Sequence, residues 1–182
     1  MGEAESQNFD LMVQMLGNWY KAWDAHILQH GSPLDKTQTR VARCVGVTSP
    51  ERVRVLWIPS IPMPHYPLLY STLVESRLIT PDANGLTVGY GILIKSDAFL
   101  AKYWVAHELV HVAQIERGGS SAVLRQYLSE ILTSGYEGSS LEKEAHSTAM
   151  NCLAADESAR QELPAFIFEG WPEAGKQQGG QQ

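Results

Sequence analysis

The sequence predicts an α+β fold in which a small sheet packs on three consecutive helices. Residues 8–30 and 98–160 repeat apolar side chains at three- and four-residue steps, which is typical of amphipathic helices. Residues 39–95 instead contain short β-type runs separated by turn-forming residues. The 182-residue chain has the length of one domain. We expect that domain to span residues 1–172, followed by a disordered polar tail over 173–182.

The N-terminal half is expected to contain one long helix followed by the sheet. Gly31-Ser32-Pro33 predicts the end of the helix over 8–30. Strands are expected over residues 41–47, 53–58 and 86–95, and the segment 68–79 fits a helix or a strand. Gly89 and Gly91 lie inside the last strand, which indicates a bulge or a close approach of another part of the chain.

The C-terminal half is expected to be helical. Asp97 is a candidate N-cap for a helix over 98–116, which Gly118-Gly119 ends. A second helix is expected from Ser120 to about Ser134, before Gly135. A third is expected from Ser139 or Ser140 to about Arg160.

Composition restricts the classes of partner. With 14 Lys and Arg against 20 Asp and Glu, the net charge is −6, which argues against nucleic acid as the main partner. No apolar run approaches the ~20 residues that span a bilayer, and the first ten residues do not resemble a signal peptide. Cys44 and Cys152 are too few for a disulfide scaffold and are expected to be buried small hydrophobes in a reducing compartment. These features predict a cytoplasmic protein and leave its oligomeric state open.

The motif that indicates chemistry is His107-Glu108-Leu109-Val110-His111, an HExxH pattern inside a predicted helix. The spacing of four residues places both imidazoles on one helix face, so both can bind one metal ion. Zinc lowers the pKa of bound water to about 7, and a carboxylate next to the first ligand can accept the proton. The motif therefore predicts a zinc site, with Glu108 as the general base.

A catalytic zinc site needs a third protein ligand and one open position. The metzincin pattern is excluded, because Gln114 and Arg117 occupy the positions that would be Gly and His. The remaining candidates are the acidic residues and the histidine that follow the motif: Glu130, Glu137, Glu142, Glu144 and His146.

Two of these candidates are supported by different arguments. Glu142 is predicted to share the apolar face of its helix with Ala145, Ala149 and Leu153, whereas Glu144 points elsewhere. A competing role for Glu142 is a capping box with Ser139. Glu130 is separated from His111 by 18 residues, a spacing found in one class of zinc aminopeptidases whose Gly-x-Met-Glu-Asn segment is absent here. His146 is an alternative that would bind the metal or brace a ligand.

The segments HELVHVAQ, YLSEILTSGY and LEKEAH together resemble a largely uncharacterised group of bacterial zincin-like peptidases with HELxHxxQ and ExEA motifs. The likeness covers about residues 98–150. The spacing of Glu142 and Ala145 is also similar to the Glu-x-x-Ala-Asp segment of membrane zinc endopeptidases, with His146 in place of the Asp. The resemblance implies a zincin-like fold of gluzincin type, with the sheet packed on the zinc-binding helix and the two following helices. It also implies that His107, His111 and Glu142 bind zinc.

The expected function is a zinc-dependent hydrolase, a metallopeptidase that acts on a peptide or protein substrate. Tyr136 is a candidate donor to the oxyanion, and Gln114 is a candidate hydrogen-bond partner of the ligand shell. The strand over 86–95 is a candidate for pairing with an extended substrate. Two alternatives stay open: a hydrolase of other amides, and a non-catalytic zincin-like module that binds a protein partner.

Overall fold

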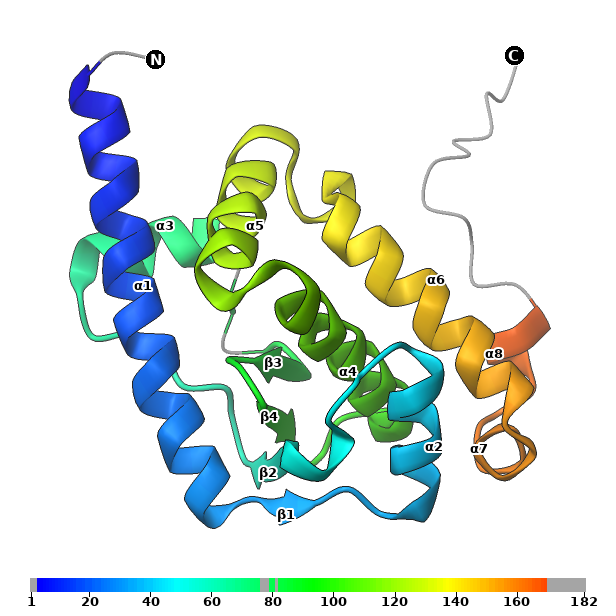
Figure 1. The fold of residues 1–182 in the computed structure, drawn as a ribbon. Helices are drawn as coiled ribbons and strands as arrows, with labels where there is room; N and C mark the ends of the chain where they lie inside the picture. Colours follow the sequence, from blue (N-terminus) through cyan, green and yellow to red (C-terminus); the bar gives the residue numbers. More distant parts are fainter. Residues whose placement is uncertain (1–2, 76–78, 81, 170–182) are drawn as a thin grey trace, which may run out of the picture.

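The computed structural model describes residues 3–75, 79–80 and 82–169 and shows a mostly helical fold around one small sheet (Figure 1). The helices are α1 (Glu3–His30), α2 (Lys36–Cys44), α3 (Pro67–Glu75), α4 (Ala101–Gly118), α5 (Ser120–Ser134), α6 (Ser140–Ala155), α7 (Glu157–Gln161) and α8 (Phe166–Glu169). The strands are β1 (Ser32–Pro33), β2 (Arg54–Ile58), β3 (Gly85–Thr87) and β4 (Gly91–Lys95). Two short 3-10 turns are η1 (Pro50–Arg52) and η2 (Tyr136–Gly138). The prediction of helices combined with a small sheet is confirmed.

The sheet separates two layers of helices. Its strand order is β1-β2-β4-β3, with β2 and β4 parallel and both edge strands antiparallel to their neighbours. Ile92 and Ile94 of β4 contribute to the core formed with α2, α4 and α6, whereas Leu93 contributes to the core formed with α1 and α5. Successive strand side chains point to opposite faces, so β4 is buried on both sides. Figure 1 shows α1 along one side of the sheet and α4 along the other.

The strand predicted over 41–47 is wrong, because most of this segment belongs to α2. Asp35 and Gln38 form a capping box: the Asp35 carboxylate accepts from the Gln38 amide, and the Gln38 side chain accepts from the Asp35 amide. The cap starts a helix that buries Val41 and Ala42 in the core. The strand expected over 53–58 is confirmed as β2, and the ambiguous segment 68–79 is helical up to Glu75.

The single strand predicted over 86–95 is two antiparallel strands, β3 and β4. The chain reverses at Gly89, whose φ of +156° favours glycine. The Asp24 carboxylate of α1 lies here and accepts a hydrogen bond of 2.7 Å from the Gly91 amide. A Cβ at Gly89 would lie 2.6 Å from the Asp24 Cγ. The expected close approach at these glycines is therefore confirmed, and the approaching element is α1.

Two predictions about helix ends are wrong. Asp97 is not an N-cap, because α4 begins at Ala101 after Leu100, a residue with a left-handed φ of +63° and no capping side chain. The helix expected from Ser140 to Arg160 is divided at Asp156 into α6 and α7. The Asp156 carboxylate accepts from the Ala159 amide and so caps α7. The tail predicted over 173–182 lies outside the described residues.

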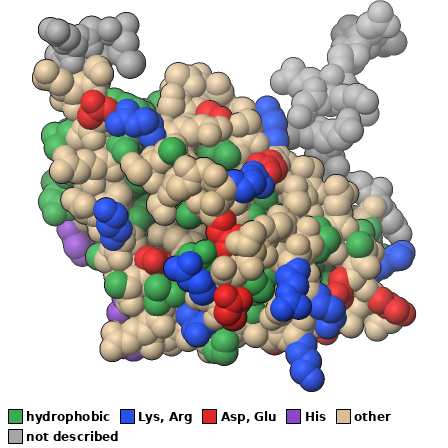
Figure 2. All heavy atoms as spheres, viewed as in Figure 1, with side chains coloured by type: hydrophobic (Ala, Val, Ile, Leu, Met, Phe, Trp, Pro, Cys, Tyr) green, Lys and Arg blue, Asp and Glu red, His purple; other side chains and the backbone are tan. Residues whose placement is uncertain are grey.

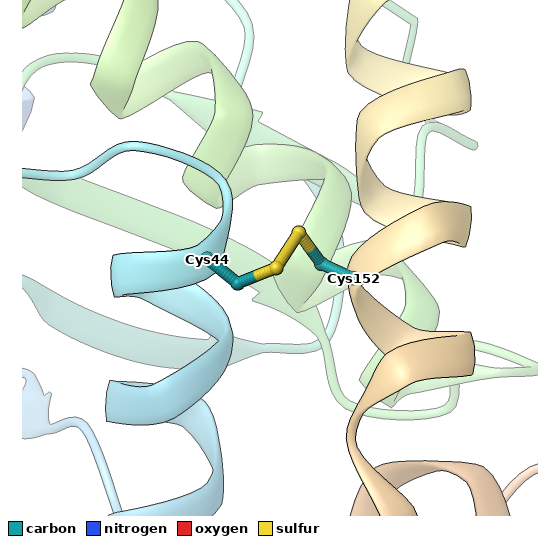
Figure 3. Close-up of a disulfide and its surroundings, with 2 residues drawn as sticks. All are labelled: Cys44 and Cys152. Carbon is teal, nitrogen blue, oxygen red and sulfur yellow. A yellow bond between two sulfur atoms is a disulfide. The ribbon is translucent and has the colours of Figure 1, made fainter.

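Cys44 and Cys152 form a disulfide between α2 and α6, so the prediction of two separate thiols is wrong (Figure 3). The two residues are 108 positions apart, and no local pattern relates them. Both helices pack on α4, which brings the two Cα atoms to 5.8 Å. The cysteines therefore do not support a reducing compartment, because disulfides are rare there.

The described helices include none that is long and apolar enough to cross a membrane. On the face shown in Figure 2, basic and acidic side chains are interspersed with apolar ones.

Candidate metal centre

The HExxH motif lies in the middle of α4, on the part of the helix that is buried between the sheet and α6. The side chains of His107 and Glu108 are almost fully buried, and that of His111 is 16% exposed. The Nε2 atoms of His107 and His111 lie 3.2 Å apart. Two nitrogens bound to one tetrahedral zinc ion at about 2.0–2.1 Å would be separated by about 3.3 Å. The helix therefore presents the two imidazoles at the spacing that zinc requires.

Glu142, in the first turn of α6, points at the same two imidazoles. Its Oε2 lies 3.1 Å from His107 Nε2, and its Oε1 lies 3.4 Å from His111 Nε2. The ligand atoms of the three residues all lie within 4.8 Å of one another. The structure thus brings together the ligand set expected from the sequence, although α4 and α6 are separated by α5.

The polar atoms of this group fit a metal ion. Among the described residues, two buried side-chain atoms lack a hydrogen-bond partner, and both belong to the group: His107 Nδ1 and Glu142 Oε2. A buried carboxylate oxygen without a donor is costly unless a cation neutralises it. Two imidazole nitrogens and one carboxylate oxygen are the donors of a common class of catalytic zinc site.

Gln114 fixes the tautomer of His111. The Gln114 Oε1 atom accepts a hydrogen bond of 2.8 Å from His111 Nδ1, so Nε2, which faces Glu142, is the nitrogen left to bind a metal. The Nε2 atom of Gln114 donates to the Leu141 carbonyl and to the Glu144 carboxylate. Glu144 also accepts a hydrogen bond from Arg117. The predicted role of Gln114 beside the ligand shell is supported by these contacts.

Glu108 is held by β3, a contact that the sequence analysis missed. The Thr87 hydroxyl donates to Glu108 Oε2 over 2.7 Å. A Cβ at Gly85 would lie 2.5 Å from Glu108 Oε1, so only glycine leaves room for the carboxylate. Burial raises the pKa of Glu108 above its usual range, although the neighbouring imidazoles and the Thr87 hydroxyl oppose the shift.

Two tyrosines lie against the Glu142 carboxylate. The Tyr127 hydroxyl, from α5, donates to Glu142 Oε1, and the sequence analysis did not identify this residue. Tyr136, in η2, is the predicted oxyanion donor, and its hydroxyl also lies next to Glu142. Burial and the Glu142 charge raise the pKa of Tyr136 well above its usual range, so its hydroxyl remains a donor at neutral pH.

The alternative third ligands have other contacts. Glu130 accepts hydrogen bonds from the Ser139 hydroxyl and from both the amide and the hydroxyl of Ser140, and so caps the N-terminus of α6. Burial would raise the pKa of Glu130, but its hydrogen bonds from Ser140, Gln126 and Ser139 lower it to about 2. His146 Nδ1 bonds the Tyr103 hydroxyl over 2.8 Å, and Glu137 is exposed.

The competing capping box is present only in part. The Ser139 hydroxyl accepts from the Glu142 amide over 3.4 Å, which makes Ser139 the N-cap of α6. The Glu142 side chain does not return to the Ser139 backbone and instead points at the imidazoles. The backbone amide of Glu142 thus takes part in the cap of α6, while its side chain is a candidate metal ligand.

The candidate centre lines a cavity of about 770 Å³. Its walls come from α1, Thr80, the segment 82–89, α4, α5, η2 and the first turn of α6. The predicted site residues all line it: His107, Glu108, His111, Tyr136 and Glu142. The contribution of α1, through residues such as Gly17 and Tyr20, is not indicated by the sequence, where the apolar repeat of this helix predicts only core packing.

No protein-family profile matches the chain, and neither the curated proteins nor the solved structures include a significant match. The resemblance to zincin-like peptidases therefore stays a prediction from three short motifs.

Proposed function

We propose that the protein is a zinc-dependent hydrolase that cleaves peptide bonds. The observation that carries this proposal is the buried group of His107, His111 and Glu142, whose ligand atoms lie within 4.8 Å of one another, beside a fourth buried side chain, Glu108, in one cavity. Without a metal ion, the two buried carboxylates have only the two imidazoles to offset their charge. His107, His111 and Glu142 are the candidate metal ligands, and Glu108 is the candidate acid/base group.

The roles of the protein's own residues follow from these contacts. Zinc held by His107, His111 and Glu142 supplies Lewis acidity, which polarises a carbonyl and lowers the pKa of water. The Glu108 carboxylate, held at Oε2 by the Thr87 hydroxyl, takes a proton from water and passes it to the leaving amine. The Tyr136 hydroxyl lines the same cavity and is the proposed donor to the oxyanion that forms at the substrate carbonyl.

Purified wild-type protein is expected to hold about one zinc ion per chain. His107→Ala and His111→Ala should each remove most of the metal, because two remaining ligands cannot compete with solvent for zinc. Elemental analysis after dialysis against a weak chelator measures the content. Lys102→Ala, on the same helix but at its exposed start, is the control and should retain zinc. Equal metal content in all four proteins would show that the ligand set is wrong.

The zinc-loaded protein is expected to cleave members of a diverse peptide library. Removing zinc with a chelator should abolish cleavage, and adding zinc should restore it. Mass spectrometry of the products identifies the cleaved bonds. A zinc-loaded protein that cleaves no peptide would instead favour the non-catalytic module or a hydrolase of other amides.

Zinc affinity is expected to rise with pH up to about 9. Burial alone would lower the pKa of His111, but the Glu142 carboxylate raises it to about 9 in the metal-free protein. Below that pH the imidazole carries a proton that zinc must displace, so affinity falls as pH falls. Chelator competition at several pH values measures the trend, and calorimetry in buffers of different ionisation enthalpy should detect about one proton released per zinc at neutral pH. Affinity that is independent of pH between 7 and 9 would contradict this coupling.

Replacing Glu142 and Glu130 separately tests the third ligand. Glu142→Ala should weaken zinc binding by more than the ~100-fold at the upper end of the range for residues beside the ligand shell. Glu130→Ala removes the carboxylate that binds Ser139 and Ser140 at the N-terminus of α6, so it should lower thermal stability while changing zinc affinity much less. Chelator competition and thermal denaturation measure the two effects. The opposite pattern would identify Glu130 as the ligand.

A further inference from the structure

The two oxygens of Glu142 have different environments. Oε1 accepts a hydrogen bond from the Tyr127 hydroxyl of α5. Oε2 lies 3.1 Å from His107 Nε2 and has no other hydrogen-bond donor among the described residues. A carboxylate can bind a metal through one oxygen or through both. Oε1 also lies 3.4 Å from His111 Nε2, so the Tyr127 hydroxyl competes with a metal for the oxygen that a two-oxygen mode would need.

Tyr127 is itself held in place. Neighbouring residues of α5, Leu124, Leu128 and Ile131, are buried in the core shared with α1, which fixes the helix beneath the site. The Tyr127 ring packs near His111, with 6.1 Å between the ring centroids. A hydroxyl carried on a packed ring is pre-oriented, so it holds a carboxylate more firmly than a flexible side chain would.

We propose that Tyr127 is a positioning residue that restricts Glu142 to metal binding through Oε2 alone. This inference rests on the proposed metal site. Three ligand atoms, one each from His107, His111 and Glu142, then leave the fourth tetrahedral position open for water next to Glu108. Without the hydroxyl, Glu142 Oε1 is free to bind the metal as well, which adds a fifth ligand beside the water.

The protein contains a matched control for this contact. The Tyr90 hydroxyl donates to the Glu116 carboxylate of α4 over 2.9 Å. This is again a hydrogen bond from a tyrosine to a helical glutamate, but Glu116 is not one of the three candidate ligands. Tyr90→Phe therefore removes the same kind of hydrogen bond as Tyr127→Phe and leaves the three candidate ligands untouched. It also reports any general effect of deleting a partly buried hydroxyl on stability.

The test uses Co²⁺ as a spectroscopic substitute for zinc in full-length wild type, Tyr127→Phe and Tyr90→Phe. Four-coordinate Co²⁺ absorbs visible light more strongly than five-coordinate Co²⁺. Tyr127→Phe should therefore show weaker visible absorption than wild type, and zinc affinity that is about 10–100-fold lower by chelator competition. Tyr90→Phe should match wild type in both. An unchanged cobalt spectrum in Tyr127→Phe overturns the proposal, whatever its affinity.

A measurement on the wild type alone keeps the proposal testable if Tyr127→Phe does not fold. A crystal structure of the zinc-loaded protein should place one Glu142 oxygen at about 2.0–2.2 Å from zinc and the other on the Tyr127 hydroxyl. Two oxygens at that distance would overturn the proposal. If wild type binds neither Co²⁺ nor zinc, or if His107→Ala binds them equally well, the metal site fails together with this inference. Normal wild-type binding with an unchanged Tyr127→Phe spectrum rejects the role of Tyr127 only.

Discussion

Glu108→Gln is expected to retain zinc and to lower peptide hydrolysis at least ~100-fold, within the range typical of a general base. The amide has nearly the shape of the carboxylate, and its oxygen can still accept from the Thr87 hydroxyl, so the packing around β3 should be preserved. An amide cannot accept the proton of water at neutral pH, so the chemical step is lost. Steady-state kinetics on a cleaved library peptide and metal analysis of the same sample measure the two properties.

Glu116→Gln is the matched control for this substitution. Glu116 also lies on α4, but its carboxylate accepts from the Thr48 and Ser49 amides and from the Tyr90 hydroxyl, outside the metal group. We expect kcat and KM close to those of wild type in this variant. Loss of zinc from Glu108→Gln would indicate a ligand or structural role, and full activity would remove Glu108 from the chemistry.

The part of the candidate site that could be predicted is the part that is local in sequence. His107, Glu108 and His111 lie within five residues of one helix, so the helical repeat alone determines their relative placement. The choice of Glu142 over Glu144 depended on which carboxylate shares the apolar face of its helix, again a local property. Both arguments use one element at a time, and for that reason they need no knowledge of the tertiary structure.

The contacts that orient these groups could not be predicted in the same way. Thr87 reaches Glu108 from a strand that lies 21 residues earlier, and Tyr127 reaches Glu142 from a different helix. Gln114 is the exception, because it lies one turn from His111 on the same helix. The sequence pattern around Thr87 or Tyr127 is the same whether the hydroxyl orients a ligand or only packs in the core, so periodicity does not reveal the functional role.

The wrong predictions in the fold also have physical reasons. Val41, Val45 and Val47 favoured a strand, yet the capping box of Asp35 and Gln38 starts a helix in front of them. That Asp-x-x-Gln spacing is visible in the sequence and would have indicated the helix. The tight turn at Gly89 was hidden because the apolar pattern continues through both β3 and β4.

Breaking the disulfide between Cys44 and Cys152 is expected to lower the free energy of unfolding by about 4 kcal/mol. The crosslink closes a loop of more than 100 residues, and in the chain-entropy description the stabilisation grows with the length of that loop. The crosslink joins α2 to α6, the helix that carries Glu142. Its loss lets these two segments separate in the unfolded chain. The effect should appear in the metal-free protein, because it acts on the unfolded chain rather than on the ligands.

Urea unfolding of the metal-free protein, with and without a thiol reductant, measures the change. A variant with both Cys44→Ser and Cys152→Ser is the control, since its midpoint should match that of the reduced wild type and should not respond to the reductant. Alkylation of the denatured, unreduced wild type should label neither cysteine, because the two described cysteines are joined. Two labelled thiols in that experiment, or equal stability with and without the reductant, would contradict the crosslink or its stabilising role.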